Sequence, residues 1–254
     1  MNTFENAYDI LSKNSEDIMK TIYHETFKKN GKPDPNVWTY QVGTKWANNE
    51  SQCYVEDDTH AYIKDGKLHI KATLHQDDQT CKYQSARINT KGKLEFLYGK
   101  LTIRAKMPHG KGAWPALWLM GNTDQNQVRW PLCGEIDLVE FAGNRPGLIT
   151  CAIHTDTYNH KINTDKGAKI KVLDASDVFH DYTLDWTKDY LSFQIDGKEY
   201  FRVDKAAGDT VSEWPFDHPY YLIINLAVGG WYGGAIHDED LPYEMVIESI
   251  KIEQ

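Results

Sequence analysis

Alternation of polar and apolar residues at every second position dominates long stretches of the chain. Such alternation is typical of β-strands that bury one face and expose the other. The alternating segments span residues 67–74, 100–107, 181–186, 190–195 and 246–253. One Asp-Gly pair, at residues 65–66, precedes the segment 67–74, and another, at residues 196–197, follows the segment 190–195. Such pairs predict tight hairpin turns.

The opening residues follow a different period. Phe4, Ala7, Tyr8 and Leu11 recur at helical spacing, so we expect one short amphipathic helix in an N-terminal extension, residues 1–20. No helical pattern of this kind separates the later strands, which disfavours a βαβ fold. Many short strands with turn residues between them predict an all-β sandwich. Without a linker or repeat, we expect one domain, residues 1–254.

Composition narrows the classes of partner. The formal net charge is −9 at pH 7, which argues against nucleic acid because phosphate binding requires a positive surface. No stretch approaches the length of a transmembrane span, so no membrane partner is expected. Eight Trp and fifteen Tyr serve a core or a sugar-binding cleft equally well, since pyranose rings stack on aromatic faces.

The four cysteines, Cys53, Cys81, Cys133 and Cys151, form no C-x-x-C pair. We expect mainly free, partly buried thiols, with one disulfide as the alternative. Cysteine usage therefore leaves the compartment open. Residues 1–20 contain no apolar run long enough for a signal peptide. The chain is then either cytoplasmic or has lost its signal.

Three carboxylates stand in an otherwise apolar segment, Glu135-Ile136-Asp137-Leu138-Val139-Glu140. In a regular strand Glu135 and Asp137 share a face, whereas Glu140, five positions on, points to the opposite face. Only a strand with one extra residue, a β-bulge, brings all three to one side. The sequence therefore predicts a bulge between Asp137 and Glu140.

Two carboxylates on one face suit retaining glycoside hydrolysis, in which one attacks the anomeric carbon and the other protonates the leaving oxygen. The middle Asp137 would hydrogen-bond the nucleophile and separate the two glutamate pKa values. The competing interpretation is a strand whose acidic residues face solvent or hold a cation.

The surrounding residues favour the catalytic interpretation. Residues 130–141 resemble the signature of glycoside hydrolase family 16, in the E-x-D-x-x-E form of its laminarinase branch. Further segments resemble family blocks in the same order: W-x-N-N-E-x-Q-x-Y at 46–54, S-A-R at 85–87 and G-x-G-x-W-P-A-x-W at 110–118. The last is N-L-A-V-G-G-W at 225–231, which resembles the family's N-L-A-V-G-G-x-W but is one residue shorter.

This resemblance implies a β-jelly roll of two curved antiparallel sheets with a substrate cleft on the concave face. It implies that Glu135 is the nucleophile, Asp137 its helper and Glu140 the acid/base. Trp114 and Trp118, four apart and therefore on one strand face, resemble the sugar-stacking platform. The other expected substrate-binding residues are Asn48, Arg87, Trp130, His154, Asn225 and Trp231.

Many family members hold a structural Ca²⁺, and oxygen atoms are its usual ligands. The corresponding positions here are Glu25, Gly66 and Glu248, but the sequence departs from the family pattern before Phe27 and at Glu248. No cofactor is expected to be required.

The resemblance predicts an endo-acting hydrolase of β-1,3-linked glucan, with mixed-linkage β-1,3/1,4-glucan as a further candidate substrate. One alternative is a hydrolase of red-algal galactans. Another, of a different class, is a non-catalytic lectin-like domain, which would need no pair of carboxylates in acid and nucleophile roles. We expect a monomer. A polymeric substrate implies a secreted or periplasmic enzyme.

Overall fold

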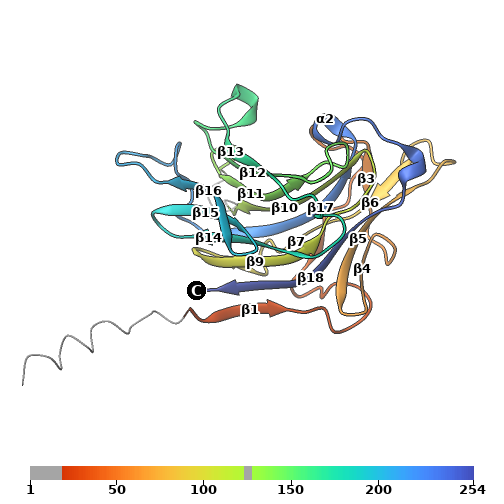
Figure 1. Cartoon of the computed structure of the whole chain (residues 1–254), viewed down its shortest axis with the longest axis horizontal. Helices are drawn as coiled ribbons and strands as arrows, with labels where there is room; N and C mark the ends of the chain where they lie inside the picture. Colours follow the sequence, from red (N-terminus) through yellow and green to blue (C-terminus); the bar gives the residue numbers. More distant parts are fainter. Residues whose placement is uncertain (1–18, 123–127) are drawn as a thin grey trace, which may run out of the picture.

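A computed structural model describes residues 19–122 and 128–254 of the chain. Two curved β-sheets pack face to face in these residues (Figure 1), which confirms the predicted all-β jelly-roll sandwich. The helix expected at the N-terminus rests on residues outside the described part. Among the described residues, no helix has the length and apolar character needed to cross a bilayer.

The larger sheet has ten strands and contains both ends of the described chain. Its strands, in spatial order, are β16 (Lys198–Asp204), β15 (Tyr190–Ile195), β14 (His180–Trp186), β9 (Gly99–Lys106), β18 (Tyr243–Glu253), β5 (Lys67–Leu74), β6 (Tyr83–Ser85) and β3 (Gln52–Tyr54), with β1 (Thr21–Glu25) paired to β18 and β4 (Ala61–Lys64) to β5.

The smaller sheet has eight strands and carries the cleft described below. In spatial order they are β13 (Lys166–Lys171), β12 (Leu148–His154), β11 (Glu135–Phe141), β10 (Ala113–Gly121), β17 (Tyr220–Val228), β7 (Arg87–Asn89) and β2 (Thr39–Tyr40), with β8 (Glu95–Phe96) paired to β17. Within residues 19–122 and 128–254, three short helices lie in the connections: η1 (His160–Ile162), α2 (Gly230–Gly233) and η2 (Asp238–Asp240).

The alternating segments form the expected strands. Residues 67–74 are β5, and 190–195 are β15, while β9 begins one residue before the predicted 100–107 segment. In both Asp-Gly turns the Asp and the Gly have positive φ, as a two-residue hairpin of the mirror-image type requires. One pair departs from the antiparallel expectation, because β3 runs parallel to β6.

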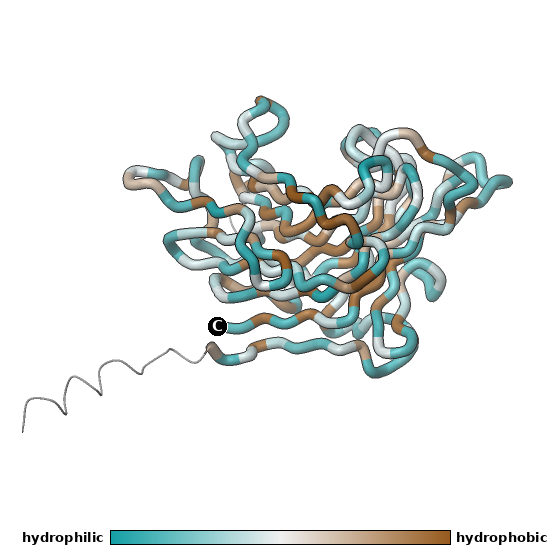
Figure 2. The backbone as a smooth tube through the Cα atoms, in the orientation of Figure 1, coloured by the Kyte–Doolittle hydropathy of each residue, from teal (hydrophilic) through white to brown (hydrophobic). Residues whose placement is uncertain are grey.

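The core fills the space between the sheets. Leu101, Ile103 and Ala105 of β9 are fully buried from one side, and Ile136 and Val139 of β11 from the other. The tube in Figure 2 is accordingly most hydrophobic along the central strands and hydrophilic in the connections. Each such Leu or Ile side chain contributes about 1.5–3 kcal/mol through burial.

The expectation of mainly free thiols was wrong for two of the four cysteines. Cys53 in β3 and Cys81, just before β6, form a disulfide with a Cα–Cα distance of 5.4 Å. The parallel pairing of β3 with β6 brings the two residues together, although 28 positions separate them in sequence. Cys133 and Cys151 are free and buried, as expected.

Candidate active site

The bulge in β11 is present where the parity argument placed it. Asp137 pairs with Ala152 of β12, and Glu140 pairs with Thr150, so three steps along β11 face two along β12. The same irregularity appears against β10. Leu138 and Val139 are consequently both buried in the core, and Glu140 returns to the face that carries Glu135 and Asp137.

A glycine fixes the start of this strand. Gly134, directly before Glu135, has φ +76°, and a Cβ there would lie 1.9 Å from the Tyr220 hydroxyl oxygen. Only glycine fits this position without displacing Tyr220. The close approach anchors Glu135, whose side chain is only 14% exposed, at the edge of the cleft.

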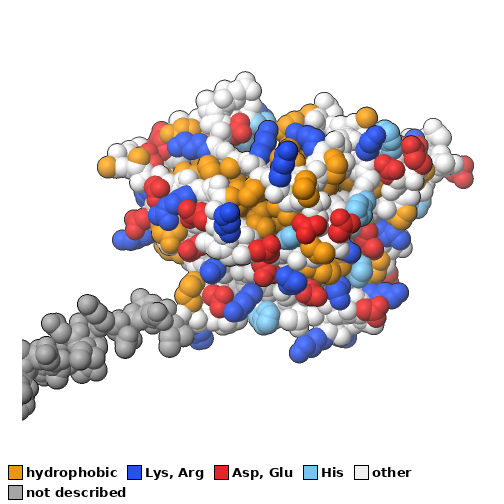
Figure 3. Space-filling view, viewed as in Figure 1, with side chains coloured by type: hydrophobic (Ala, Val, Ile, Leu, Met, Phe, Trp, Pro, Cys, Tyr) orange, Lys and Arg blue, Asp and Glu red, His pale blue; other side chains and the backbone are white. Residues whose placement is uncertain are grey.

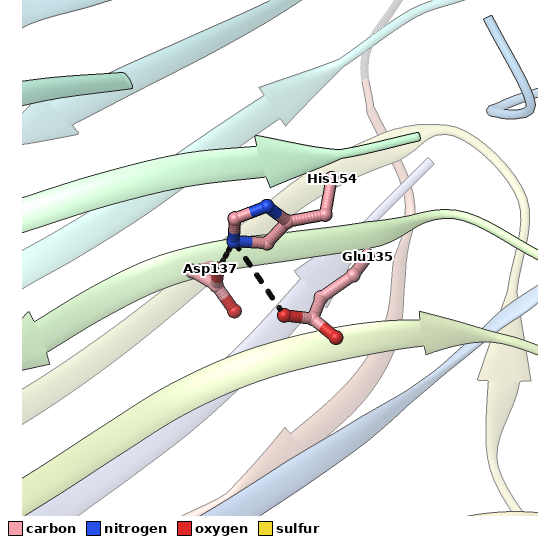
Figure 4. A group of neighbouring side chains, drawn as sticks. All are labelled: Glu135, Asp137 and His154. Carbon is pink, nitrogen blue, oxygen red and sulfur yellow. Dashed lines mark ion pairs between the residues drawn. The ribbon is translucent and has the colours of Figure 1, made fainter. Parts of the chain in front are cut away.

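His154 on the neighbouring strand β12 points at the first two carboxylates (Figure 4). Its Nε2 lies 3.1 Å from Asp137 Oδ2 and 3.8 Å from Glu135 Oε1. The ligand atoms of these three residues lie within 4.8 Å of one another, a spacing that could hold a metal ion. Two of the three, Glu135 and Asp137, are the residues that the sequence predicts as the nucleophile and its helper.

Glu140 is held by a different partner. The indole N–H of Trp114 donates a 3.0 Å hydrogen bond to Glu140 Oε1. Burial raises the pKa of Glu140, and this bond opposes the rise because it favours the ionised carboxylate. Burial followed by the charge of Asp137 raises the pKa of Glu135 well above its ordinary value, while His154 lowers it.

Asp137 completes the cluster between the two glutamates. Burial, followed by the charge of Glu140, raises its pKa well above the ordinary aspartate value. Each of these desolvated carboxylates disfavours ionisation of its neighbours, which favours retention of a proton in the cluster. A site that keeps one carboxyl group protonated beside an ionised one can supply an acid and a nucleophile together.

The three carboxylates lie at the junction of two cavities along the concave face. We call them the Arg87 cavity, of about 370 Å³, and the Lys169 cavity, of about 990 Å³. All eight predicted substrate-binding residues line one or both: Asn48 and Trp114 both; Arg87, Trp118, Trp130 and Asn225 the first; His154 and Trp231 the second. The structure therefore brings every one of them to the cleft.

Hydrogen-bonded side chains form the floor of the Arg87 cavity. Trp118 Nε1 donates to Asn225 Oδ1 at 2.7 Å, and Asn225 Nδ2 donates to the buried Tyr54 hydroxyl at 3.0 Å. The Arg87 guanidinium lies 4.8 Å from the Trp118 ring centroid and 5.2 Å from that of Trp46. These contacts present aromatic and polar surface side by side, which suits the faces and hydroxyl groups of a sugar.

Sequence reasoning missed several residues of the cleft. Trp46 and Glu50 line the Arg87 cavity and lie inside the 46–54 block, so that block could have identified them. Tyr232 follows the predicted Trp231 and lines the Lys169 cavity. His160 and Lys161 of η1 line both cavities, and no motif in the sequence indicated them.

The residues expected at a calcium site have other partners. Glu25 Oε1 accepts hydrogen bonds from the backbone N–H groups of Thr26 and Phe27. Glu248 Oε2 accepts from Arg104 Nε at 2.7 Å, and Lys67 Nζ lies 4.0 Å from its other oxygen. Two cationic side chains therefore already contact Glu248, and the calcium site expected at Glu25, Gly66 and Glu248 remains a prediction.

Comparison with known proteins identifies the family. The model of the glycosyl hydrolases family 16 matches residues 41–246. The chain belongs to this family. It is therefore a glycoside hydrolase, and the match contains the complete carboxylate cluster.

Relatives of this family 16 enzyme match nearly its whole length. A β-glucanase of Rhodothermus marinus is 35% identical over 240 residues, which cover 91% of this chain and 84% of the relative. The laminarinase structure from that organism superposes with a TM-score of 0.89 at 34% identity, covering 93% and 97% of the two chains. A non-specific endo-β-1,3(4)-glucanase superposes with a TM-score of 0.87 at 34% identity, covering 93% and 91%.

Proposed function

We propose that this enzyme hydrolyses internal β-1,3-glucosidic bonds of glucans with retention of anomeric configuration. The carboxylate cluster on the bulged strand carries the proposal. Glu135 and Glu140 share one face at the junction of two cavities, so a chain lying across the sheet meets both. Cavities on both sides of the cluster are what an enzyme that cuts within a polymer requires.

We infer distinct roles for the two glutamates, as the family resemblance implies. Glu140 protonates the leaving oxygen, and its burial supports a neutral form that can act as an acid. Glu135 attacks the anomeric carbon, and the glucosyl–enzyme bond forms as the glycosidic bond breaks. His154 contacts Glu135 and Asp137, whereas Trp114 contacts Glu140. Glu140 then takes a proton from water, whose oxygen displaces Glu135 and completes the hydrolysis.

The relatives support glucan as the substrate. Proteins described as a laminarinase and as an endo-β-1,3(4)-glucanase share the fold and about a third of the sequence. A mutant of the latter was crystallised with a 1,3-β-D-cellobiosyl-glucose at its active site. Mixed-linkage β-1,3/1,4-glucan is accordingly a second substrate that we propose for this chain.

Reducing-sugar release from laminarin, lichenan and agarose tests the substrate. We expect hydrolysis of laminarin and of lichenan, and none of agarose. Glu135→Gln should abolish turnover and leave laminarin binding nearly intact, because the amide cannot act as nucleophile but keeps the shape of the side chain. Release from agarose alone would favour the galactan alternative, and binding without release by the wild type would favour a lectin-like domain.

The stereochemistry provides an independent test. The β-anomer should appear first when early products are followed by NMR, because two displacements at the anomeric carbon restore its configuration. Early appearance of the α-anomer would rule out Glu135 as a nucleophile. That result would leave the substrate assignment in place while changing the mechanism.

We also propose that the enzyme acts as a monomer outside the cytoplasm. The Cys53–Cys81 disulfide supports an oxidising compartment, where such bonds persist. On the face in Figure 3, acidic and basic side chains are interspersed rather than gathered by sign. Light scattering after size-exclusion chromatography tests the monomer, and fractionation of the native host tests the location.

A further inference from the structure

The connection between β12 and β13 carries His160 across the cleft. The His160 ring centroid lies 5.2 Å from that of Trp130 and 6.1 Å from that of Trp231. Trp130 precedes Glu135 by five residues, whereas Trp231 packs at 5.6 Å against Trp114, the partner of Glu140. His160 therefore joins the wall on the Glu135 side to the wall on the Glu140 side.

The loop that presents His160 is internally braced. Asn159, only 3% exposed, donates from its side chain to the carbonyl oxygens of Thr155 and Asp156 at 3.0 and 3.1 Å. Its own backbone N–H donates to Thr164 Oγ1 at 3.1 Å. These bonds tie both ends of the loop together, so the position of His160 is set by the fold.

The bridge lies over the carboxylate cluster. His160 lines the Arg87 cavity and the Lys169 cavity, which share the three carboxylates. Its ring also meets that of His154 edge-on at 5.0 Å, and His154 contacts Asp137. The neighbouring Lys161 Nζ lies 4.5 Å from the Trp130 ring centroid and strengthens the same wall.

Rings with centroids 5–6 Å apart are in van der Waals contact. A glucosyl branch, which is as thick as an aromatic ring, cannot pass between them. Trp231 is 57% exposed although it also packs against Trp114 and Tyr232, and its contact with His160 is the longer of the two that close the roof. The contact of His160 with Trp130 and Trp231 is then compatible with a linear chain lying beneath these rings, whereas a branched sugar obstructs it.

We propose that His160, with Trp130 and Trp231, roofs the cleft over the scissile bond and is a specificity-determining residue that excludes branched glucose units there. The inference rests on the proposed glucanase function, since it concerns the glucan chain in the same cleft. It adds a selection against branches that the carboxylates and the sugar platform do not provide.

Two defined oligosaccharides test this roof: linear β-1,3-linked glucohexaose and the same hexaose with one β-1,6-linked glucosyl branch on a central unit. We would measure kcat/KM and product patterns for the wild type and for His160→Ala and Trp231→Ala. The wild type should not cut the bonds flanking the branched unit. Each variant should raise the branched-to-linear ratio of kcat/KM at least tenfold.

His109→Ala is the matched control, because His109 is 73% exposed and pairs with Asp177 away from the cleft. It should keep the wild-type ratio. A ratio unchanged in both roof variants, with the linear hexaose still cleaved, would overturn the proposal. Failure of the wild type on the linear hexaose would instead overturn the glucanase assignment, and with it the roof, so the two failures are distinguishable.

Discussion

Replacing Trp114 with Phe tests which glutamate is the acid. The change keeps an aromatic ring against Trp231 but removes the indole N–H that donates to Glu140 at 3.0 Å. Because that bond favours the ionised carboxylate, its loss raises the pKa of Glu140. A general acid must be protonated to work, so activity falls as pH rises through its pKa, and the variant should stay active to higher pH.

The size of the effect follows from the bond. A hydrogen bond to a charged group contributes about 1.5–3 kcal/mol, and a tenfold change in a protonation equilibrium corresponds to about 1.4 kcal/mol. The midpoint of the alkaline limb of kcat/KM should therefore move up by about one pH unit or more. The acid limb, which reports ionisation of Glu135, should stay in place.

The measurement is kcat/KM on laminarin across pH for the wild type, Trp114→Phe and Trp118→Phe. Trp118 is the control because its indole N–H donates to Asn225, not to a carboxylate. Its variant should weaken substrate binding and leave both limbs unmoved. A shift of the acid limb in Trp114→Phe would reverse the roles of Glu135 and Glu140, and unmoved limbs would show that the Trp114 bond does not tune the acid.

Three further predictions concern the fold around the site. Deleting Leu138 removes the bulge but leaves an even spacing from Asp137 to Glu140, so laminarin hydrolysis should persist. Thermal melting should show that the free energy of unfolding falls by about 2–5 kcal/mol, as for Leu138→Ala. A deletion variant that folds but is inactive would contradict the parity argument. Replacing Cys53 and its partner with Ala should lower the unfolding free energy by about 2–4 kcal/mol in denaturant titration, whereas an unchanged midpoint would mean that the bond adds no stability. Arg104 donates to Glu248 at 2.7 Å and so already supplies a positive charge at this residue. EDTA should therefore leave the melting temperature unchanged, whereas a fall in melting temperature that Ca²⁺ reverses would indicate a calcium site.

The bulge could be predicted from sequence because parity is a property of the chain itself. An odd offset between Asp137 and Glu140 in an apolar segment leaves few ways to place both at one site. The hairpin turns and the long strands were predictable for the same reason, since alternation and Asp-Gly pairs act locally. The fold class and the catalytic strand therefore depend on information within short segments.

Contacts between distant segments could not be predicted in this way. The offset of four placed Trp114 and Trp118 on one face, but the pairing of Ala116 with Glu140 decides that Trp114 meets Glu140. The partner of Cys53 depends on two strands lying parallel, and the reach of His160 depends on how its connection folds back. Each is set by the register or path of elements far apart in the sequence.

The extra residue in β11 links the stability of the core to the chemistry of the cleft. Leu138 and Val139 are 1% and 0% exposed although they are adjacent, so both anchor the strand from beneath. The bulge that buries both side chains also directs Glu140 to the cleft, where the Trp114 indole N–H donates a hydrogen bond to it. Repacking beneath the bulge would move Glu140 relative to Glu135 without touching either. Since a misplacement of about 1 Å can cost 10²-fold in rate, the packing beneath the bulge bears on the rate of hydrolysis as well as on stability.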